Sequence, residues 1–317
     1  MSVLNAVECK GGVRIVPGEL VLGADDAATM RRSVVGHVGG LATLTVRGLN
    51  GKERTITWKR SAGPPSHAVT SRTLPNGSRH VKVDSFSGSG PFDRGNSSAI
   101  KRHLQAPTDA RGLVLDLRGN PGGGRSAMDT AALFFDDKRT FAAFLCRDRN
   151  RAGSDGTEAL AGIRRVRPEL SLVPWVSIGR ILTFLEVMRG NRSFAIELTG
   201  DGTFADTDVV VLIDEGTRSA AEMLASFLRE QCGATLIGRH SGGECAMPAS
   251  VRLPATDWSA HIASCRVITG TGVPIEGRGL APDIPVTHRR EDLAIGRDAD
   301  IEHAIDHLHS LRSGHTD

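Results

Sequence analysis

The 317-residue chain contains no tyrosine, so no phenol can serve as an acid or a base. Lysine is scarce as well, and the second half of the chain has none. The lysines are Lys10, Lys52, Lys59, Lys82, Lys101 and Lys138. A mechanism that needs an amine base late in the chain is therefore excluded.

Long apolar runs are also missing. The first residues lack the basic start and apolar core of a secretory leader, and no uncharged apolar run reaches the length of about 18 residues that crosses a membrane. Basic and acidic residues nearly balance, 39 against 36, and the basic ones are scattered. We therefore expect a cytoplasmic protein with neither a membrane nor a nucleic-acid partner.

The five cysteines are odd in number, lie far apart and form no C-x-x-C motif. This spacing favours neither a disulfide framework nor a zinc site. We expect unpaired thiols in a reducing compartment, and the sequence predicts neither a metal nor another cofactor. The cysteines are Cys9, Cys146, Cys232, Cys245 and Cys265.

The N-terminal part of the chain predicts a small unit of its own. A helix-like stretch covers 25–38, and two alternating runs at 41–48 and 53–60 flank Asn50-Gly51, a strong hairpin signal. Residues 61–66 have the composition of a linker. The chain is therefore expected to divide into regions 1–60 and 61–317.

The second region alternates strands with helices, which predicts an α/β fold with parallel β-α-β units. Strands are expected at 80–86, 112–118, 140–148, 208–216, 234–238, 249–253 and 260–268, and helices at 95–105, 125–135, 219–233 and 299–312. Residues 147–195, which are rich in arginine, are expected to form an insertion or a lid.

A serine opens the predicted helix that follows the strand at 208–216. Ser219 would lie where free backbone N–H groups and the helix dipole favour negative charge, a place suited to an oxyanion. The alternative is an ordinary helix cap, in which Ser219 and Glu222 form a capping box.

A glycine-rich turn follows the buried strand near 112–118. It carries Gly122, Gly123 and Gly124, which let the backbone approach a ligand and present N–H groups to it. The spacing matches neither a phosphate-binding loop nor a dinucleotide fingerprint. The alternative is a plain turn between a strand and a helix.

Four motifs together resemble a known family. LVLDLRGNPGGG, VVVLIDEGTRSAAEM, GATLIGRHSGG and IEGRGLAPDIPV occur in the order found in the C-terminal processing (tail-specific) serine peptidases, over about 74–317. The T-x-S-A-A-E form is most similar to the branch of the tricorn core and the nisin-resistance protein. The resemblance implies a ClpP/crotonase-like catalytic domain, preceded at 1–60 by a truncated PDZ-like region.

The resemblance also implies roles for individual residues. Ser219 matches the nucleophile, and the oxyanion hole is expected at the backbone N–H of Ala220 with a second donor from Gly122 or Gly123. The chemistry agrees, because each such donor typically contributes a factor of about 10²–10³ in rate.

The general base departs from the family pattern. Glu244 occupies the position of the lysine of the usual Ser-Lys dyad, and the histidine of the other branch lies upstream of the region matched here. Among the remaining candidates we rank His80 and His240 above His67.

Lys82 is a further candidate base, because it shares a strand face with the histidine two residues before it. Glu276 resembles the carboxylate that supports the base in the tricorn-like branch, and Glu244 competes for that role.

Two functions follow. The first is a serine hydrolase that cleaves a peptide or peptide-like substrate through a Ser219 acyl-enzyme with a base other than lysine. The second is a catalytically degenerate protein that binds peptides or uses the oxyanion pocket for other acyl or eliminative chemistry. Self-association into a homo-oligomer is compatible with either function.

Overall fold

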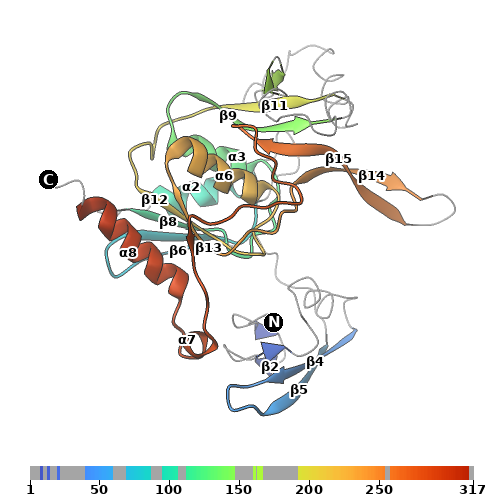
Figure 1. Cartoon of the computed structure of the whole chain (residues 1–317), viewed down its shortest axis with the longest axis vertical. Helices are drawn as coiled ribbons and strands as arrows, with labels where there is room; N and C mark the ends of the chain where they lie inside the picture. The colour runs from blue at the N-terminus through green and yellow to red at the C-terminus, as the bar shows by residue number, and fades with distance from the viewer. Residues whose placement is uncertain are drawn as a thin grey trace. The chain divides into compact units, whose positions relative to one another are not determined.

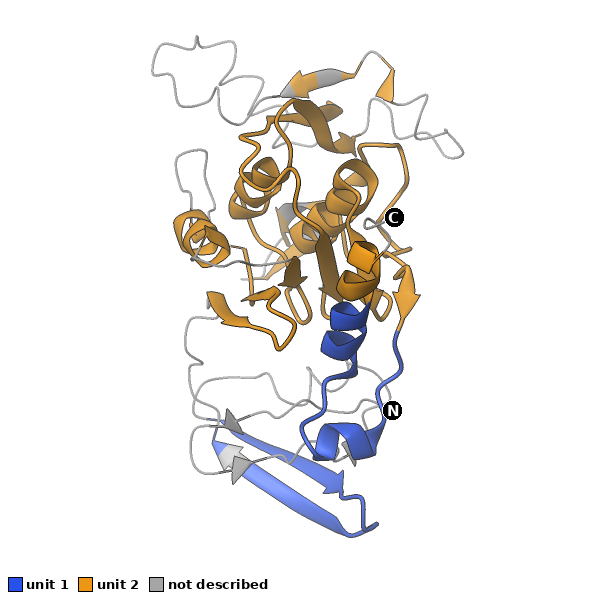
Figure 2. Cartoon of the chain, turned by 90° about the vertical axis from the view of Figure 1, so that its left-hand side faces the viewer, with its two compact units in different colours: residues 1–66, 286–306 blue, residues 67–285, 307–317 orange. Residues whose placement is uncertain are grey.

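The structure is a computed structural model, and its described residues fall in two compact units. Unit 1 comprises 1–66 and 286–306, and unit 2 comprises 67–285 and 307–317 (Figure 2). No helix in the described part is long and apolar enough to cross a membrane. The described residues are 8–9, 13–14, 20–21, 40–59, 69–86, 95–105, 112–146, 160–161, 163–166, 192–253 and 258–313.

Three sequence-based expectations fall outside these residues. The helix expected at 25–38, the linker 61–66 and the candidate base His67 are among the residues that are not described. Most of the expected insertion at 147–195 is not described either.

Unit 1 contains the hairpin that the Asn50-Gly51 signal predicts. Strands β3 (Leu20–Val21), β4 (Leu41–Arg47) and β5 (Glu53–Lys59) form a three-stranded sheet in that order. Gly51 has a φ of 76°, which glycine adopts without strain. The unit also contains the short strands β1 (Glu8–Cys9) and β2 (Val13–Arg14) and the helix α7 (Arg290–Ala294).

The first sheet of unit 2 has six strands in the order β16-β13-β12-β8-β7-β6. All its pairs are parallel except β6 with β7, which confirms the expected parallel β-α-β units. The strands are β6 (Val69–Thr73), β7 (Arg79–Val83), β8 (Leu113–Asp116), β12 (Val209–Ile213), β13 (Thr235–Gly238) and β16 (Ile284–Pro285).

A second sheet has five strands in the order β10-β11-β9-β15-β14 and is mostly antiparallel. The strand and helix pattern alone did not predict this sheet, because its strands pair across long stretches of sequence. The strands are β9 (Lys138–Leu145), β10 (Arg164–Val166), β11 (Phe194–Thr199), β14 (Ala246–Arg252) and β15 (Ser259–Thr269).

Helices lie between the two sheets and share one apolar core with both (Figure 1). Phe227 of α6 packs against Phe135 and Phe141, with ring centroids 5.3 and 5.5 Å away. The helices that contribute to this core are α2 (Ser97–Gln105), α3 (Ser126–Ala131), the 3₁₀ turn η1 (Ala132–Phe134) and α6 (Ala220–Cys232). The described part also holds α8 (Ala299–Ser313), which begins in unit 1 and ends in unit 2.

A disulfide between Cys146 and Cys265 corrects the expectation of unpaired thiols. Cys146 directly follows β9 and Cys265 lies in β15, and these antiparallel strands bring the two residues together although they are 119 positions apart in the sequence. Spacing along the chain could not show this, because the pairing depends on the second sheet. Cys232 and Cys245 are free thiols.

Candidate active site

Ser219 lies at the sharp turn between β12 and α6. Its φ of 54° and ψ of −123° make it the one non-glycine residue with a positive φ in the described part of the chain. Such a conformation costs on the order of 1–3 kcal/mol and persists only where the surroundings enforce it. The side chain is half-buried, so it is not sealed inside the core.

The glycine turn after β8 packs directly against this serine. A Cβ atom on Gly122 would lie 2.7 Å from the Cβ of Ser219, 2.7 Å from the carbonyl oxygen of Arg218 and 2.9 Å from the amide nitrogen of Ala220. A Cβ on Gly123 would lie 1.4 Å from the carbonyl oxygen of Phe86. Only glycine fits either position. The contacts of Gly122 show that the glycine turn and the start of α6, both predicted from the sequence, lie against each other.

Two backbone donors near Ser219 have no acceptor within the described residues. They are the N–H groups of Gly123 and Ala220. The N–H of Gly122 instead donates to Oδ1 of Asn120 at 2.9 Å. Of the two glycines considered, Gly123 is therefore the one whose donor remains available for a ligand.

Asn120 fixes the glycine turn in place. Its side chain is fully buried, and its Nδ2 donates to the carbonyl oxygen of Val83 at 2.8 Å. Its own carbonyl oxygen accepts the N–H of Arg218 at 2.9 Å. Asn120 was not among the residues that the sequence predicts at the site. An asparagine that precedes a Pro-Gly turn is the signal that could have revealed it, because asparagine side chains commonly bond the backbone two residues on.

Glu222 is buried in α6 and ties three segments to one another. Its carboxylate accepts the N–H of Ser219 at 3.0 Å, the hydroxyl of Ser241 at 2.6 Å and the N–H of Gly243 at 2.8 Å. Burial raises the pKa of Glu222, although these hydrogen bonds oppose the shift. The capping box that was considered as the alternative role of Ser219 and Glu222 is present, and the contacts of Glu222 extend beyond the helix.

The loop after β13 closes over the backbone of Ser219. The carbonyl oxygen of Glu244 accepts the N–H of Ser219 at 3.0 Å, and the thiol of Cys245 lies 3.5 Å from the carbonyl oxygen of Ser219. The carboxylate of Glu244 pairs with Arg218 at 2.5 Å. The position at which the resemblance expects a lysine therefore carries an ion pair. Burial raises the pKa of Cys245 well above its usual range, which disfavours its thiolate.

His240 and Glu276 lie on segments that join this loop. Nδ1 of the exposed His240 is 3.1 Å from the carbonyl oxygen of Ser241, and a Cβ on Gly279 would lie 3.0 Å from the same nitrogen. Glu276 is exposed and accepts the N–H of Cys245 at 2.6 Å. Among the described contacts, neither side chain touches Ser219.

His80 lies in a different environment. Its Nε2 is 3.1 Å from the carboxylate of Asp116, which Arg118 binds through two nitrogens at 2.7 and 2.9 Å. Burial alone would raise the pKa of Asp116, but the hydrogen bonds from Arg118 and His80 hold it well below its usual range. Asp116, Arg118 and His80 therefore form one hydrogen-bonded cluster.

The sheet register shows which face carries His80. Val81 and Val83 belong to the core that contains α6, so His80 and Lys82 project from the opposite face of β7. Ser219 opens α6 on the core side. The structure therefore does not bring His80 or Lys82 together with the nucleophile candidate.

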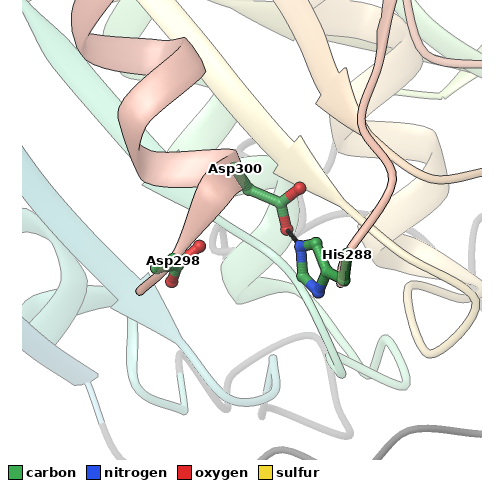
Figure 3. Close-up of side chains that lie close together, drawn as sticks. All are labelled: His288, Asp298 and Asp300. Carbon is green, nitrogen blue, oxygen red and sulfur yellow. Dashed lines mark ion pairs between the residues drawn. The ribbon is translucent and has the colours of Figure 1, made fainter. Parts of the chain in front are cut away.

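One group of side chains in unit 1 has the donor types of a metal site. Candidate ligand atoms of His288, Asp298 and Asp300 lie within 4.8 Å of one another (Figure 3). The imidazole of His288 is 2.9 Å from the buried carboxylate of Asp300, and Asp298 accepts the N–H of Ile301 at the start of α8. An ion pair and a helix cap account for these contacts.

Comparison with known proteins decides the family. The model of peptidase family S41 matches residues 80–286, which is more than half of the chain. The chain belongs to peptidase family S41. The family assignment drawn from the four motifs is thereby confirmed at the level of the C-terminal processing peptidases, and this S41 chain places Ser219, Gly122 and Glu222 within the matched region.

A curated relative supports the assignment. The S41 chain is 24% identical over 276 residues to carboxyl-terminal-processing peptidase 3, chloroplastic, of Arabidopsis thaliana. The alignment covers 83% of this chain and 44% of the relative, so the chain spans less than half the length of that protein.

Solved structures show the same α/β fold. The photosystem II D1 C-terminal processing protease matches with a TM-score of 0.53 and 17% identity, covering 94% of this chain and 69% of that one. Mature CPAF complexed with lactacystin gives 0.57 and 15%, covering 94% and 78%. A putative peptidase from Parabacteroides merdae gives 0.54 and 22%, covering 77% and 65%.

Proposed function

We propose that the chain is a serine peptidase that cleaves a peptide bond through an acyl-enzyme on Ser219. The observation that carries this proposal is the contact of the glycine turn with the strained serine, since a Cβ on Gly122 would meet both Ser219 and the amide of Ala220. Membership of peptidase family S41 supports a peptide as the substrate.

The geometry supports a two-step mechanism. Oγ of Ser219 attacks the carbonyl carbon of the substrate and passes its proton to a base, which returns a proton to the leaving amine as the C–N bond breaks. The N–H groups of Ala220 and Gly123 would bind the oxygen that becomes negative. Water then hydrolyses the acyl-enzyme by the same steps.

We propose His240 as the base and Glu276 as its supporting carboxylate. His240 belongs to the loop whose later residues contact the backbone of Ser219, whereas His80 is bound to Asp116 on the opposite face of the sheet. Substrate binding commonly tightens catalytic contacts that are long in a free enzyme. His80 remains the second candidate.

The finer relationships are proposals as well. We assign the catalytic domain to the ClpP/crotonase-like type and to the tricorn-like and nisin-resistance-like branch, on the T-x-S-A-A-E motif. The three-stranded sheet of unit 1 supports a truncated PDZ-like region at 1–60. A lid at 147–195 and a cytoplasmic location rest on the sequence alone.

The alternative of a degenerate peptide-binding protein has less support. A protein that only binds peptides does not need a strained serine beside two available N–H donors. Glu244, at the position of the usual lysine, forms an ion pair with Arg218 and so supplies no amine base. This ion pair leaves Ser219 half-buried and accessible.

Covalent labelling tests the nucleophile. We expect a fluorophosphonate probe to label the full chain stoichiometrically, and Ser219→Ala to abolish both labelling and hydrolysis of a fluorescent casein substrate. Ser226→Ala is the matched control, because Ser226 lies in the same helix and donates only to the carbonyl oxygen of Met223. Full turnover by the Ser219→Ala chain would disprove the proposal.

Chemical rescue tests the base. We expect His240→Ala to slow labelling about 10²-fold or more, the usual contribution of a positioned base, and added imidazole to restore part of the rate. His303→Ala, which removes an exposed histidine from α8, serves as the control. Rescue of His80→Ala in place of His240→Ala would move the role to His80.

A further inference from the structure

The far half of the β14 and β15 hairpin exposes large apolar side chains. Val251 is 45% exposed, Leu253 40%, Trp258 76% and Ile262 54%. Figure 1 shows these strands projecting beyond the helices of unit 2. The largest apolar patch on the surface of a monomeric protein is often functional.

The register places these four side chains on one face of the hairpin. Val251 pairs with Ala260, and the N–H of Leu253 donates to the carbonyl oxygen of Trp258. Cross-strand partners project to the same side, and so do residues two positions apart. We call Val251, Leu253, Trp258 and Ile262 the apolar hairpin face. Arg252 and Ser259 pair with each other on the opposite side.

A bulge creates this face. Met247 pairs with Cys265, but Pro248 pairs with Ala263, so one extra residue of β15 lies between these two pairs. The extra residue shifts the alternation of β15, which brings Trp258 and Ile262 to the side of Val251 and Leu253. Bulges commonly re-aim side chains in this way next to functional sites.

The apolar hairpin face continues the core side of its sheet. Met247 packs against the core of unit 2, and Val251 and Leu253 follow it at even spacing along the chain. Ser219 opens the helix α6 in that same core layer. The face and the candidate nucleophile are therefore on the same side of the five-stranded sheet.

β14 also connects the face directly to the candidate active site. It begins at Ala246, immediately after Cys245, whose thiol contacts the carbonyl oxygen of Ser219. The seven residue steps from Ala246 to Leu253 span about 23 Å at the rise of a strand. An extended polypeptide of about seven residues would cover this distance.

We infer that the apolar hairpin face is a docking site for an extended apolar segment of the polypeptide substrate, about seven residues from the bond that is cleaved. This inference rests on the proposed function. The four side chains expose on the order of 400 Å², about the largest patch on a typical monomer. That is about half of the ~800 Å² that each partner buries in a standard interface, which favours a peptide segment over a second copy of the chain.

Binding to the full Ser219→Ala chain separates docking from hydrolysis. The probe is fluorescein-labelled α-lactalbumin, reduced and carboxymethylated so that it stays unfolded, and the readout is fluorescence anisotropy. We expect Trp258→Ser with Ile262→Ser to weaken binding at least tenfold. The control, Arg252→Gln with Ser259→Asn on the opposite side, should change binding less than twofold.

A conservative variant guards against a folding defect. Trp258→Phe keeps an apolar ring at a highly exposed position and should retain binding, whereas Trp258→Ser alone should weaken it. Equal affinities of all variants, or equal losses on both sides of the hairpin, would overturn the inference. The inference would also be overturned if the chain formed a dimer in sedimentation analysis, or bound phosphatidylglycerol vesicles, and if Trp258→Ser with Ile262→Ser abolished that association.

The outcome is independent of the catalytic proposal. If the fluorophosphonate fails to label Ser219 while the apolar hairpin face still binds the unfolded probe, the peptidase mechanism fails and the docking site stands. If labelling succeeds and the variants bind the probe equally, only the docking site fails.

Discussion

Two buried carboxylates in unit 2, those of Asp116 and Glu222, differ in the groups that donate hydrogen bonds to them. Asp116 is bound by the guanidinium of Arg118 and the imidazole of His80, and its pKa is held low. Glu222 receives only neutral donors, and burial raises its pKa. The first carboxylate belongs to an ion cluster whose charges satisfy one another. The second holds in place the backbone around Ser219.

The comparison extends to the surroundings of each carboxylate. Around Ser219 a strained φ and two N–H groups without acceptors in the described residues remain after the fold is complete. Around Asp116 the hydrogen bonds are made within the cluster. The region around Ser219 keeps hydrogen-bond donors that a ligand could use, whereas the region around Asp116 uses its donors and acceptors to stabilise the fold.

Gly122→Ala should give the largest effect of the variants below, a loss of labelling at Ser219. It tests the surroundings of Ser219 without touching the cluster around Asp116. Its Cβ would lie 2.7 Å from that of Ser219, so we expect fluorophosphonate labelling to fall about 10³-fold, or about 4 kcal/mol in the barrier. Gly119→Ala is the control, because Gly119 has a φ of 74° in the same turn but no atom within 4 Å of its added Cβ. Equal loss of labelling by both variants would mean that strain, not contact with the serine, is responsible.

Asp116→Asn should break the ion cluster. Leaving Arg118 and His80 without their carboxylate should cost about 3 kcal/mol of unfolding free energy at pH 7. Because the pKa of Asp116 is lowered from 3.8, its contribution is present above that value and is lost as the pH falls. Urea unfolding from pH 7 to pH 3 should therefore show the gap between the wild type and the variant shrinking. A constant gap would contradict the ionic account.

Glu222→Gln should lower the free energy of unfolding less than Asp116→Asn does, and its effect should depend on pH in the opposite direction. The amide cannot accept from all three donors, so we expect a cost of about 2 kcal/mol in stability and slower labelling. The pKa of Glu222 is raised from 4.5, so its favourable contribution is greatest at low pH and is lost as the pH rises. The gap between the wild type and this variant should narrow from pH 4 to pH 8, and a widening gap would disprove the assignment.

Ser219→Gly should have the smallest effect on the free energy of unfolding, and this variant should be stabilised where the others are destabilised. Glycine adopts this positive φ readily, so the variant should be about 1 kcal/mol more stable than the wild type while losing labelling. Differential scanning calorimetry would measure a rise of about 2 °C in Tm. A matched or lower Tm would show that the serine is not strained.

Local patterns predicted much of the first sheet and the core of the site. The hairpin at Asn50-Gly51 and the strand before the glycine turn are confirmed, because turn residues and apolar runs act over a few positions. The resemblance to the family implied that the glycine turn and Ser219 meet, and the adjacent parallel strands β8 and β12 bring Gly122 and Ser219 together.

Long-range pairing could not be predicted from one sequence. β9 pairs with both β11 and β15, which lie far away along the chain, and the disulfide of Cys146 depends on that pairing. For the same reason the sequence ranked His80 beside His240. Only the register shows that His80 projects from the face of the sheet away from α6.

The contacts of Glu222 also bear on how the protein is made. The carboxylate joins segments around Ser219, Ser241 and Gly243, and the glycine turn that completes the surroundings of the serine comes from near Gly122. Until all of these have been synthesised and have folded, nothing holds Ser219 in its strained conformation beside the glycine turn. On the proposed mechanism, a nascent or partly unfolded chain would therefore be inert toward its neighbours, and peptidase activity would appear only once the fold is complete.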